Sequence, residues 1–437
     1  MKVMTLSRPS FYPWLIVGLL CVVGCLNYLD RMMITTMRSS ILAEIPMTDA
    51  QFGLLTSVFL WVYGLLSPLA GFLADRFNRS RVIIGSLFVW SIVTWFTARA
   101  TTFEELLLTR ALMGISEACY IPAALALIVD YHRGATRSLA TGIHMGGIMI
   151  GQSLGFVGGW LAESRTWSYA FGVFGLIGVG YAVLLALVLR DPVVPEKNTL
   201  STEPEPAIRF TEALRDLFSR RNYVVALTFW GLGGIVSWLV VGWLPTYYKE
   251  HFNLSQTVAG LYATGYFHTA SLVGVLTGGF LADRWSRTNP RGRILVPFIG
   301  LVIAAPGIFI ASSTSVLPIA IVCFMIYAFT RTFLDANMMP ILCLIADQRY
   351  RATGYGVLNL VACIVGGVGL YAGGMLRDAD VDLSRMFQFA ALTMLISAAL
   401  LYTIKPKPED ITPKSPEGDF MHLEDSASKS PSGDLGG

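Results

Sequence analysis

Twelve long apolar runs constrain this chain more than any other feature. A helix needs about 20 mostly apolar residues to cross a bilayer. Only 14% of the 437 residues are charged, against roughly 25% in an ordinary soluble domain, so a water-soluble globule and a disordered chain are both disfavoured. The sequence predicts an all-α membrane protein with twelve transmembrane helices. The runs lie near 14–37, 51–74, 82–99, 104–131, 139–162, 168–189, 223–248, 256–282, 293–312, 315–345, 352–376 and 386–404.

The positions of the basic residues predict the orientation of these helices. Cytoplasmic loops of membrane proteins carry an excess of Lys and Arg, and with the N-terminus inside, 23 of the 32 Lys and Arg fall in inside segments. We therefore expect a multi-pass plasma membrane protein with both termini cytoplasmic, and its compactness and short outside loops favour a bacterial inner membrane. The outside loops hold only Arg38, Arg99, Arg165, Lys249, Arg377 and Arg385.

A polar stretch divides the chain into two bundles. Residues 191–222 begin with a segment rich in Pro, Glu and Thr, which is typical of a linker. They end in residues 210–221, whose apolar side chains share one side of a helix, as expected for a helix at the cytoplasmic interface. The predicted domains are an N-terminal six-helix bundle (1–190), this linker, a C-terminal six-helix bundle (223–405) and a disordered cytoplasmic tail (406–437).

The two bundles repeat each other in sequence. Residues 71–76 and 279–284 share the sequence GFLADR, 208 positions apart, and the triplet ATG at 140–142 recurs 212 positions later at 352–354. Transporter folds are often built from such internal repeats. The repeat predicts two pseudo-symmetric six-helix bundles that run in the same direction through the membrane.

The repeated segment resembles the signature motif of the major facilitator superfamily, Gly-x-Leu-Ala-Asp-Arg-x-x-Arg. The resemblance covers all twelve spans and implies a transporter in which both motif copies help to close a cytoplasmic gate through charge pairs at helix ends. The alternative is that the arginines only enforce the topology of their loops. The gate residues would be Gly71, Asp75, Arg76 and Arg79 in the first bundle and Gly279, Asp283, Arg284 and Arg287 in the second.

Two further motifs resemble particular branches of this superfamily. Asn27–Arg31 (NYLDR) and Arg110–Ala118 (RALMGISEA) are similar to the anion:cation symporter branch, which includes carriers of hexuronates, aldonates and sialic acid. The same motifs also resemble Spinster-like carriers of lysophospholipids and sphingolipids, as does the loop Arg287–Arg291 (RTNPR). The resemblance therefore implies two alternative cargoes, a small organic anion or a lipid.

Charged residues inside the first bundle are candidates for the transport mechanism. A charged side chain at the bilayer centre costs roughly 2.5–3.5 kcal/mol, so it needs a partner or a function. We expect Arg31 and Arg110 to offer planar donors to a substrate carboxylate, while Asp30 and Glu117 bind and release protons. In one arrangement Asp30 faces Arg110, and Arg31 turns toward the cavity. The alternative is a static ion-pair network that only orients the helices.

The second bundle and the uncharged polar residues supply further candidates for substrate binding. Arg331 and Asp335 stand four residues apart, so they can pair along one helix or line the cavity. Other polar residues inside the spans could bind substrate hydroxyls, although a lone membrane His is about as often a helix–helix hydrogen-bonding group. These candidates are Tyr28, Tyr120, His144, Gln152, His268, Asn337 and Asn359.

Together these features favour secondary transport. The sequence has no nucleotide-binding or hydrolase motif, so an ion gradient would supply the energy, and we do not expect an enzyme. We expect proton-coupled symport of a small organic anion, in particular a sugar acid such as a hexuronate or aldonate, by alternating access. A Na⁺ partner, a lipid cargo and a transport-dead receptor are the alternatives. No cofactor, metal or nucleic acid is expected; the partners are the substrate, H⁺ and the lipid bilayer, and the protein is expected to be a monomer.

Overall fold

The computed structural model of the protein describes residues 11–132, 136–192 and 210–405. The described chain is helical and contains no strand, which confirms the all-α prediction. The predicted tail (406–437) and the first part of the predicted linker lie outside the described residues, as does the side chain of the predicted gate residue Asp75.

Helices follow one another along the whole described chain. The N-terminal half contains α1 (Tyr12–Thr36), α2 (Arg38–Glu44), α3 (Asp49–Arg76), α4 (Arg79–Thr97), α5 (Phe103–Ala118), α6 (Tyr120–Tyr131), α7 (Arg137–Ser153), α8 (Phe156–Ser164) and α9 (Trp167–Val188). The linker helix is α10 (Phe210–Ser219). The C-terminal half contains α11 (Arg221–His251), α12 (Gln256–Gly260), η2 (Leu261–Tyr266), α13 (Phe267–Ser286), α14 (Gly292–Ser313), α15 (Leu317–Ile345), η3 (Gln348–Tyr350), α16 (Arg351–Asp378) and α17 (Leu383–Tyr402).

The helical segments correspond to the predicted spans. Within the part of the chain that the structure describes, eleven segments are long and apolar enough to cross a membrane. The predicted span 256–282 is not among these eleven, because α13 is not apolar enough. It carries polar residues such as His268 and ends near two charged residues, Asp283 and Arg284. The span nevertheless runs through α12, η2 and α13 without a gap in helical structure.

Irregular turns interrupt three of the predicted spans. Cys119 separates α5 from α6, residues 154–155 separate α7 from α8, and η2 is a π-helical turn between α12 and α13. The last two irregularities touch each other across the two halves, where the hydroxyl of Thr264 donates to the carbonyl oxygen of Ser153 at 3.4 Å. Hydrophobic periodicity does not mark such turns, so the predicted spans run through all three of them.

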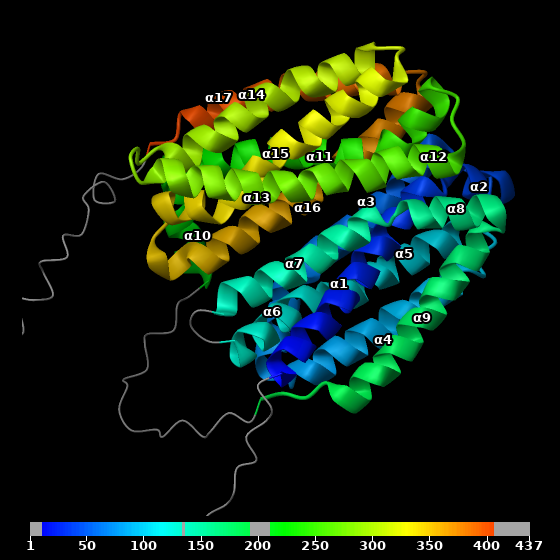
Figure 1. The fold of residues 1–437 in the computed structure, drawn as a ribbon, viewed down its shortest axis with the longest axis horizontal. Helices are drawn as coiled ribbons and strands as arrows, with labels where there is room; N and C mark the ends of the chain where they lie inside the picture. Colours follow the sequence, from blue (N-terminus) through cyan, green and yellow to red (C-terminus); the bar gives the residue numbers. More distant parts are fainter. Residues whose placement is uncertain (1–10, 133–135, 193–209, 406–437) are drawn as a thin grey trace, which may run out of the picture.

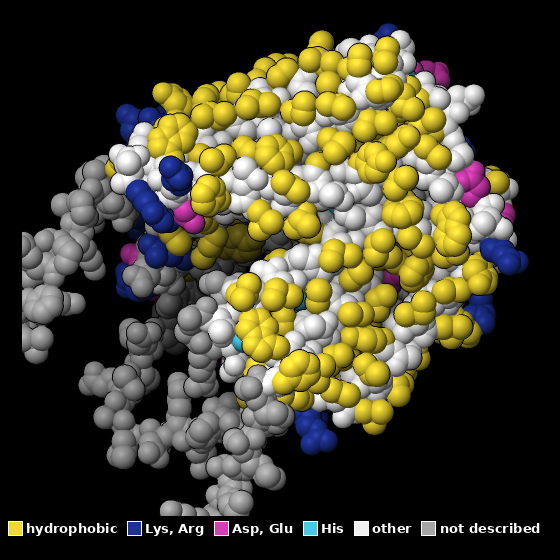
Figure 2. Space-filling view, in the orientation of Figure 1, with side chains coloured by type: hydrophobic (Ala, Val, Ile, Leu, Met, Phe, Trp, Pro, Cys, Tyr) yellow, Lys and Arg dark blue, Asp and Glu magenta, His cyan; other side chains and the backbone are white. Residues whose placement is uncertain are grey.

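The two halves meet at one end of the molecule and diverge at the other (Figure 1). Contacts between them concentrate on α3 against α16, with further contacts of α7 with α13 and of α8 with α12. We call the end that carries α2, α8 and α12 the closed end, and the opposite end, where α6 and α7 separate from α10 and α13, the open end. Figure 2 shows the hollow between the halves at the open end.

Glycines allow the main helix pair between the halves to pack closely. A Cβ atom added at Gly374 of α16 would lie 2.2 Å from the carbonyl oxygen of Asp49, and one added at Gly53 of α3 would lie 2.7 Å from the carbonyl oxygen of Leu370. Both obstacles are backbone atoms and cannot swing aside. The backbones of α3 and α16 therefore approach in the way that small residues permit in membranes.

We expect Gly374→Ala and Gly356→Ala, both in α16, to have opposite effects on stability. The first inserts a methyl group against the backbone of Asp49 and should cost about 1–3 kcal/mol through overpacking. Gly356 has nothing within 4 Å of an added Cβ, so alanine there should stabilise the helix by roughly 0.5–1 kcal/mol. Thermal denaturation of the two variants in the same detergent measures the difference. Equal shifts of the melting temperature would contradict the close approach of α3 and α16.

The linker helix α10 packs against the C-terminal half. Its residues Ala213 and Leu217 are fully buried, and α10 contacts α11 and α16. The hydroxyl of Tyr350 donates to the carboxylate of Glu212 at 3.1 Å, which ties α10 to the turn before α16. In that turn the backbone N–H of Arg349 donates to Asp347 and lowers the pKa of this carboxyl below its usual value. A helix therefore forms at residues 210–219, and its buried residues Ala213 and Leu217 pack against protein, while Phe218 is exposed.

Candidate functional site

A buried ion pair joins two helices of the N-terminal half. Arg31 of α1 donates through Nε to the carboxylate of Glu117 on α5 at 2.6 Å, and both side chains are almost completely shielded from solvent. Three aromatic rings surround the guanidinium, with its carbon atom 4.5 Å from the ring centres of Tyr28 and Tyr63 and 4.8 Å from that of Phe59. This geometry stabilises the cation through its carboxylate partner and the ring faces.

Asp30 and Arg110 lie beside this ion pair, but several of their polar atoms have no hydrogen-bond partner among the described residues. Asp30 accepts a hydrogen bond from the hydroxyl of Thr94 at 3.2 Å, while its other carboxylate oxygen has no partner among the described residues. Two guanidinium nitrogens of the buried Arg110 are likewise without a described partner. The expected arrangement is therefore only partly found. Arg31 does line a cavity, but it does so while paired with Glu117, and no direct ion pair joins Asp30 to Arg110 in the described structure.

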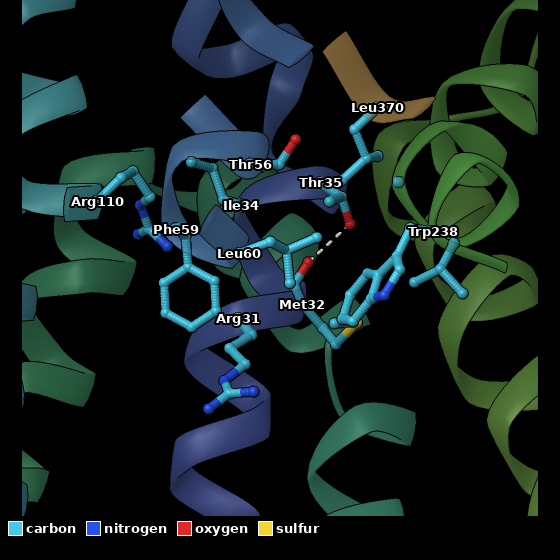
Figure 3. A pocket seen from close by; sticks show the side chains of 12 residues that line it. Arg31, Met32, Ile34, Thr35, Thr56, Phe59, Leu60, Arg110, Trp238 and Leu370 are labelled. Carbon is cyan, nitrogen blue, oxygen red and sulfur yellow. Dashed lines mark hydrogen bonds between the residues drawn. The ribbon is translucent and has the colours of Figure 1, made fainter. Parts of the chain in front are cut away.

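A small cavity connects these arginines to the interface between the halves (Figure 3). It has a volume of about 30 Å³ and is lined by Arg31, Arg110 and Phe59 from the N-terminal half and by Trp238 and Leu370 from the other half. A cavity needs roughly 10–15 Å³ to hold one water molecule. The space therefore suits water and is too small for an organic solute.

A larger cavity of about 140 Å³ lies next to the small one, since Met32, Trp238 and Val241 line both. The N-terminal half contributes Tyr28 and Gln152 to its wall. The remaining polar wall comes from the C-terminal half, through Ser237, His268, Ser271, Arg331, Thr332 and Asp335. Polar side chains from both halves thus face one space.

The charged pair in this larger cavity has the geometry that its spacing predicts. A terminal nitrogen of Arg331 donates to Asp335 at 2.9 Å, one turn along α15. The Nε2 atom of the nearby His268 is buried and has no hydrogen-bond partner among the described residues. These groups can offer hydrogen bonds to a polar solute in the cavity.

Other predicted binding residues lie elsewhere. Tyr120 is fully buried, and its hydroxyl donates to the carbonyl oxygen of Leu20 at 2.8 Å; the buried His144 packs against its ring. Asn337 donates to the carbonyl oxygens of Phe333 and Gly278, so it joins α15 to α13. Neither these three residues nor the half-buried Asn359 line the two cavities.

Two of the predicted gate residues form ion pairs within their own halves. Arg79 forms an ion pair with Asp130 inside the N-terminal half, and Asp283 pairs with Arg293 at 3.3 Å inside the C-terminal half. Both motif copies lie at the open end, where the halves are apart. A role in closing that end therefore stays a prediction for another conformation.

A polar network, which the sequence did not reveal, holds the closed end together. The carboxylate of Asp49 at the start of α3 pairs with Arg38 and with Arg377, the latter at 2.8 Å, and both arginines also pair with Glu250. The backbone N–H groups of residues 49 and 50 donate to the carboxylate of Asp378, both at 2.9 Å. Arg38 and Asp49 belong to one half and the other three residues to the other. Each residue is ordinary in its own loop, and only the fold brings them together.

Comparison with known proteins identifies the family. The family model for the Major Facilitator Superfamily matches residues 20–370 and 240–431. The chain belongs to this superfamily. Members of the major facilitator superfamily are membrane transporters rather than enzymes, and membership confirms the predicted fold class, an all-α multi-pass membrane protein.

Individual relatives within the superfamily agree with both predicted resemblances. The chain is 30% identical to protein spinster homolog 1 of Bos taurus over 316 residues, which are 68% of this chain and 60% of that protein. It thus spans less than two thirds of this relative's length. It is 27% identical to the probable sulfoacetate transporter SauU of Cupriavidus necator, over 93% of this chain and 97% of that protein.

Solved structures show the same fold. A bacterial homologue of the human lysosomal transporter Spinster, in an inward-facing and occupied conformation, matches 94% of this chain and all of its own with a TM-score of 0.76 at 22% identity. The same kind of protein in an inward-facing and unoccupied conformation gives a TM-score of 0.73 at 23% identity. At this level of identity the comparison supports the fold alone.

Proposed function

We propose that this transporter carries a small organic anion together with protons by alternating access. The observation that carries the proposal is the larger cavity, which is lined by polar side chains of both halves. A substrate held there would contact both halves at once, as alternating access around a fixed site requires. Arg331 supplies the positive charge in that wall, and Gln152, Ser237 and Ser271 can hydrogen-bond to hydroxyl groups such as those of a sugar acid.

The distribution of basic residues supports an inward-open state with both termini in the cytoplasm. Among the described residues, basic side chains gather at the open end, for example Arg79 and Arg81 at the start of α4 and Arg284 and Arg287 at the end of α13. Basic loops stay on the cytoplasmic side of a membrane. The similar fold of an inward-facing Spinster homologue agrees with this orientation.

The buried charges of the N-terminal half are the candidates for proton coupling. Protonation of Glu117 would remove the charge that Arg31 neutralises, and the small cavity gives water a place beside Arg31 and Arg110. Asp30, with one unpartnered oxygen, is a second acceptor for a proton. Because Tyr28 contacts Arg31 and also lines the larger cavity, a change in this cluster can reach the substrate. In this proposal Arg331 takes over the substrate-binding role first expected for Arg31 and Arg110.

Uptake by proteoliposomes tests the proposal. The purified protein is reconstituted and supplied with labelled hexuronates, aldonates, sialic acid or sulfoacetate, with and without a gradient of two pH units. Accumulation of one of these anions that depends on the gradient is the expected result. Empty vesicles and a protonophore are the controls, and uptake that is indifferent to the pH gradient would contradict proton coupling.

A second candidate function is the transport of a lysophospholipid or sphingolipid. The divergence of α7 from α13 toward the open end favours it (Figure 1), and both helices carry exposed apolar side chains, such as Leu139 on α7 and Leu276 on α13. The similarity to spinster homolog 1 points the same way. Labelled lysophospholipid in the same proteoliposomes decides between the two cargoes.

We expect the double variant Arg331→Gln/Asp335→Asn to weaken substrate binding. It removes both charges of the pair and leaves no carboxylate without its partner. A hydrogen bond to a charged group contributes about 1.5–3 kcal/mol, so KM for the transported anion should rise roughly 10- to 100-fold. Arg349→Gln, which removes an exposed arginine outside the cavity, is the matched control. An unchanged KM in the double variant would show that the anion binds elsewhere.

A further inference from the structure

A separate groove of about 720 Å³ opens between α13 and α14 at the open end of the C-terminal half. Both helices pack on α15, and Phe333 of α15 forms the floor of the groove. The rim is basic and polar, with Arg284, Arg287 and Thr288, whereas Leu281 and Ile299 line the wall below it. The groove therefore combines a cationic mouth with an apolar interior and lies outside the two cavities between the halves.

The arginines at the rim are not neutralised by the protein around them. Residues 283–293 contain four arginines and a single acid, Asp283. Asp283 pairs with Arg293, and Arg291 donates to the carbonyl oxygen of Tyr402 at 2.6 Å. Arg284 and Arg287 are exposed and form no ion pair or hydrogen bond with any residue that the structure describes. Figure 2 shows basic side chains gathered at this end of the C-terminal half.

In the N-terminal half, carboxylates of the same half bind the corresponding basic turn. There Arg79 pairs with Asp130 at the end of α6. The carboxylate of Asp191, which follows α9, accepts the N–H groups of Arg79 and Ser80 at 3.1 and 2.8 Å. The C-terminal half has no carboxylate at the positions that correspond to Asp130 and Asp191. Residues 336–346, near the end of α15, contain no acid, and Lys405 follows α17. An anion from outside the chain would neutralise Arg284 and Arg287 there.

We propose that this groove binds an anionic phospholipid. Its phosphate would lie at Arg284, Arg287 and Thr288, and an acyl chain would run along Leu281, Ile299 and Phe333. The rim lies at the ends of membrane-spanning helices, the level at which lipid headgroups meet basic residues. A free inorganic anion would use only the rim and leave the apolar groove unfilled, so the shape favours the lipid. This site is independent of which solute the transporter carries.

Trp285, which lines the same groove, provides a direct probe. The full-length protein is reconstituted in phosphatidylcholine vesicles that contain a small fraction of a lipid with brominated acyl chains. This lipid is either brominated phosphatidylglycerol or brominated phosphatidylcholine. Quenching that disappears in Trp285→Phe reports lipid in the groove. A basic residue near the membrane surface changes the affinity for an anionic lipid about fivefold. With two arginines, brominated phosphatidylglycerol should reach half-maximal quenching at a mole fraction roughly 25-fold lower than brominated phosphatidylcholine.

Amino-acid substitutions and a competing anion test whether the quenching reports an anionic lipid in the groove. Arg284→Gln/Arg287→Gln should abolish the preference for phosphatidylglycerol, whereas Arg349→Gln, which removes an exposed arginine elsewhere in the C-terminal half, should preserve it. Ile299→Phe, which narrows the apolar wall and keeps both arginines, should weaken quenching by phosphatidylglycerol. Equal quenching by the two brominated lipids in the unmodified protein would overturn the proposal. Reversal of the phosphatidylglycerol signal by millimolar inorganic phosphate would also overturn it, because the site would then be one for a free anion.

Discussion

Replacing Glu117 by Gln is expected to abolish proton-driven accumulation of substrate while leaving exchange of substrate across the membrane intact. Glutamine has the shape of a protonated glutamate but cannot release a proton, so the two halves can still rock without moving charge. With a gradient of two pH units, one coupled proton supports about a hundredfold accumulation. We expect Glu117→Gln to lose that accumulation, as measured by uptake in proteoliposomes, and to retain counterflow of labelled substrate.

The control for this experiment lies on the same helix. Glu105 is exposed near the start of α5 and hydrogen-bonds to Thr101 in its own loop, so Glu105→Gln should accumulate substrate normally. Removing the carboxylate of Glu117 also leaves Arg31 without its charged partner, which in a buried pair can cost roughly 3–5 kcal/mol. Intact counterflow shows that the variant is folded. If Glu117→Gln still accumulates substrate along the pH gradient, Glu117 is not the coupling site.

Replacing Asp49 by Asn should open the closed end. Asp49 bridges Arg38 of its own half and Arg377 of the other, and all three side chains are mostly buried, with 12–16% exposure. Without the negative charge of Asp49, the guanidinium groups of Arg38 and Arg377 repel each other. Glu250 is then the one carboxylate with which both arginines still pair among the described residues. Because the groups are partly solvated, we expect a loss of about 1–3 kcal/mol, which shifts the balance toward separation of this end roughly 10- to 100-fold.

Distances between spin labels measure this shift. Labels on cysteines introduced at Thr166 in the N-terminal half and Ser315 in the C-terminal half, in a background without the native cysteines, report the gap at the closed end. The Asp49→Asn variant should show a larger population of long distances. Asp380→Asn removes an exposed carboxylate from the neighbouring loop and keeps a residue that tolerates the positive φ of 60° found there, so it should leave the distances unchanged. A similar distribution in Asp49→Asn would mean that the network does not hold the end closed.

The arrangement of helices was largely predictable because hydropathy and the internal repeat report it directly. A continuous run of about 20 apolar residues indicates a transmembrane helix, and the spacing of Arg331 and Asp335 already indicates their pairing. The irregular turn at η2 was not predictable, because a π-turn depends on tertiary packing and leaves the apolar pattern unchanged.

The details of the site depended on relations between helices that sequence spacing does not encode. The pairing of Arg31 with Glu117 requires the distance between α1 and α5, which are far apart in the chain. Tyr120 is a polar residue inside a predicted span and was therefore a candidate for binding, yet its ring lies in the core of its own half. The network around Asp49 draws on several separate segments, so no local pattern could have revealed it.

The polar nature of the closed end has a consequence for the surroundings of the protein. Glu250 is 44% exposed, whereas Asp49, Arg38 and Arg377 are mostly buried, and salt screens solvated charges far more than buried ones. Added salt should therefore weaken the pairs that Glu250 forms with Arg38 and Arg377 while leaving the glycine-mediated contact of α3 with α16 unaffected. The equilibrium between the two faces of the transporter then depends on the ionic strength of the solution that bathes this end, so salt on one side of the membrane would alter the rate of transport without binding at the substrate cavity.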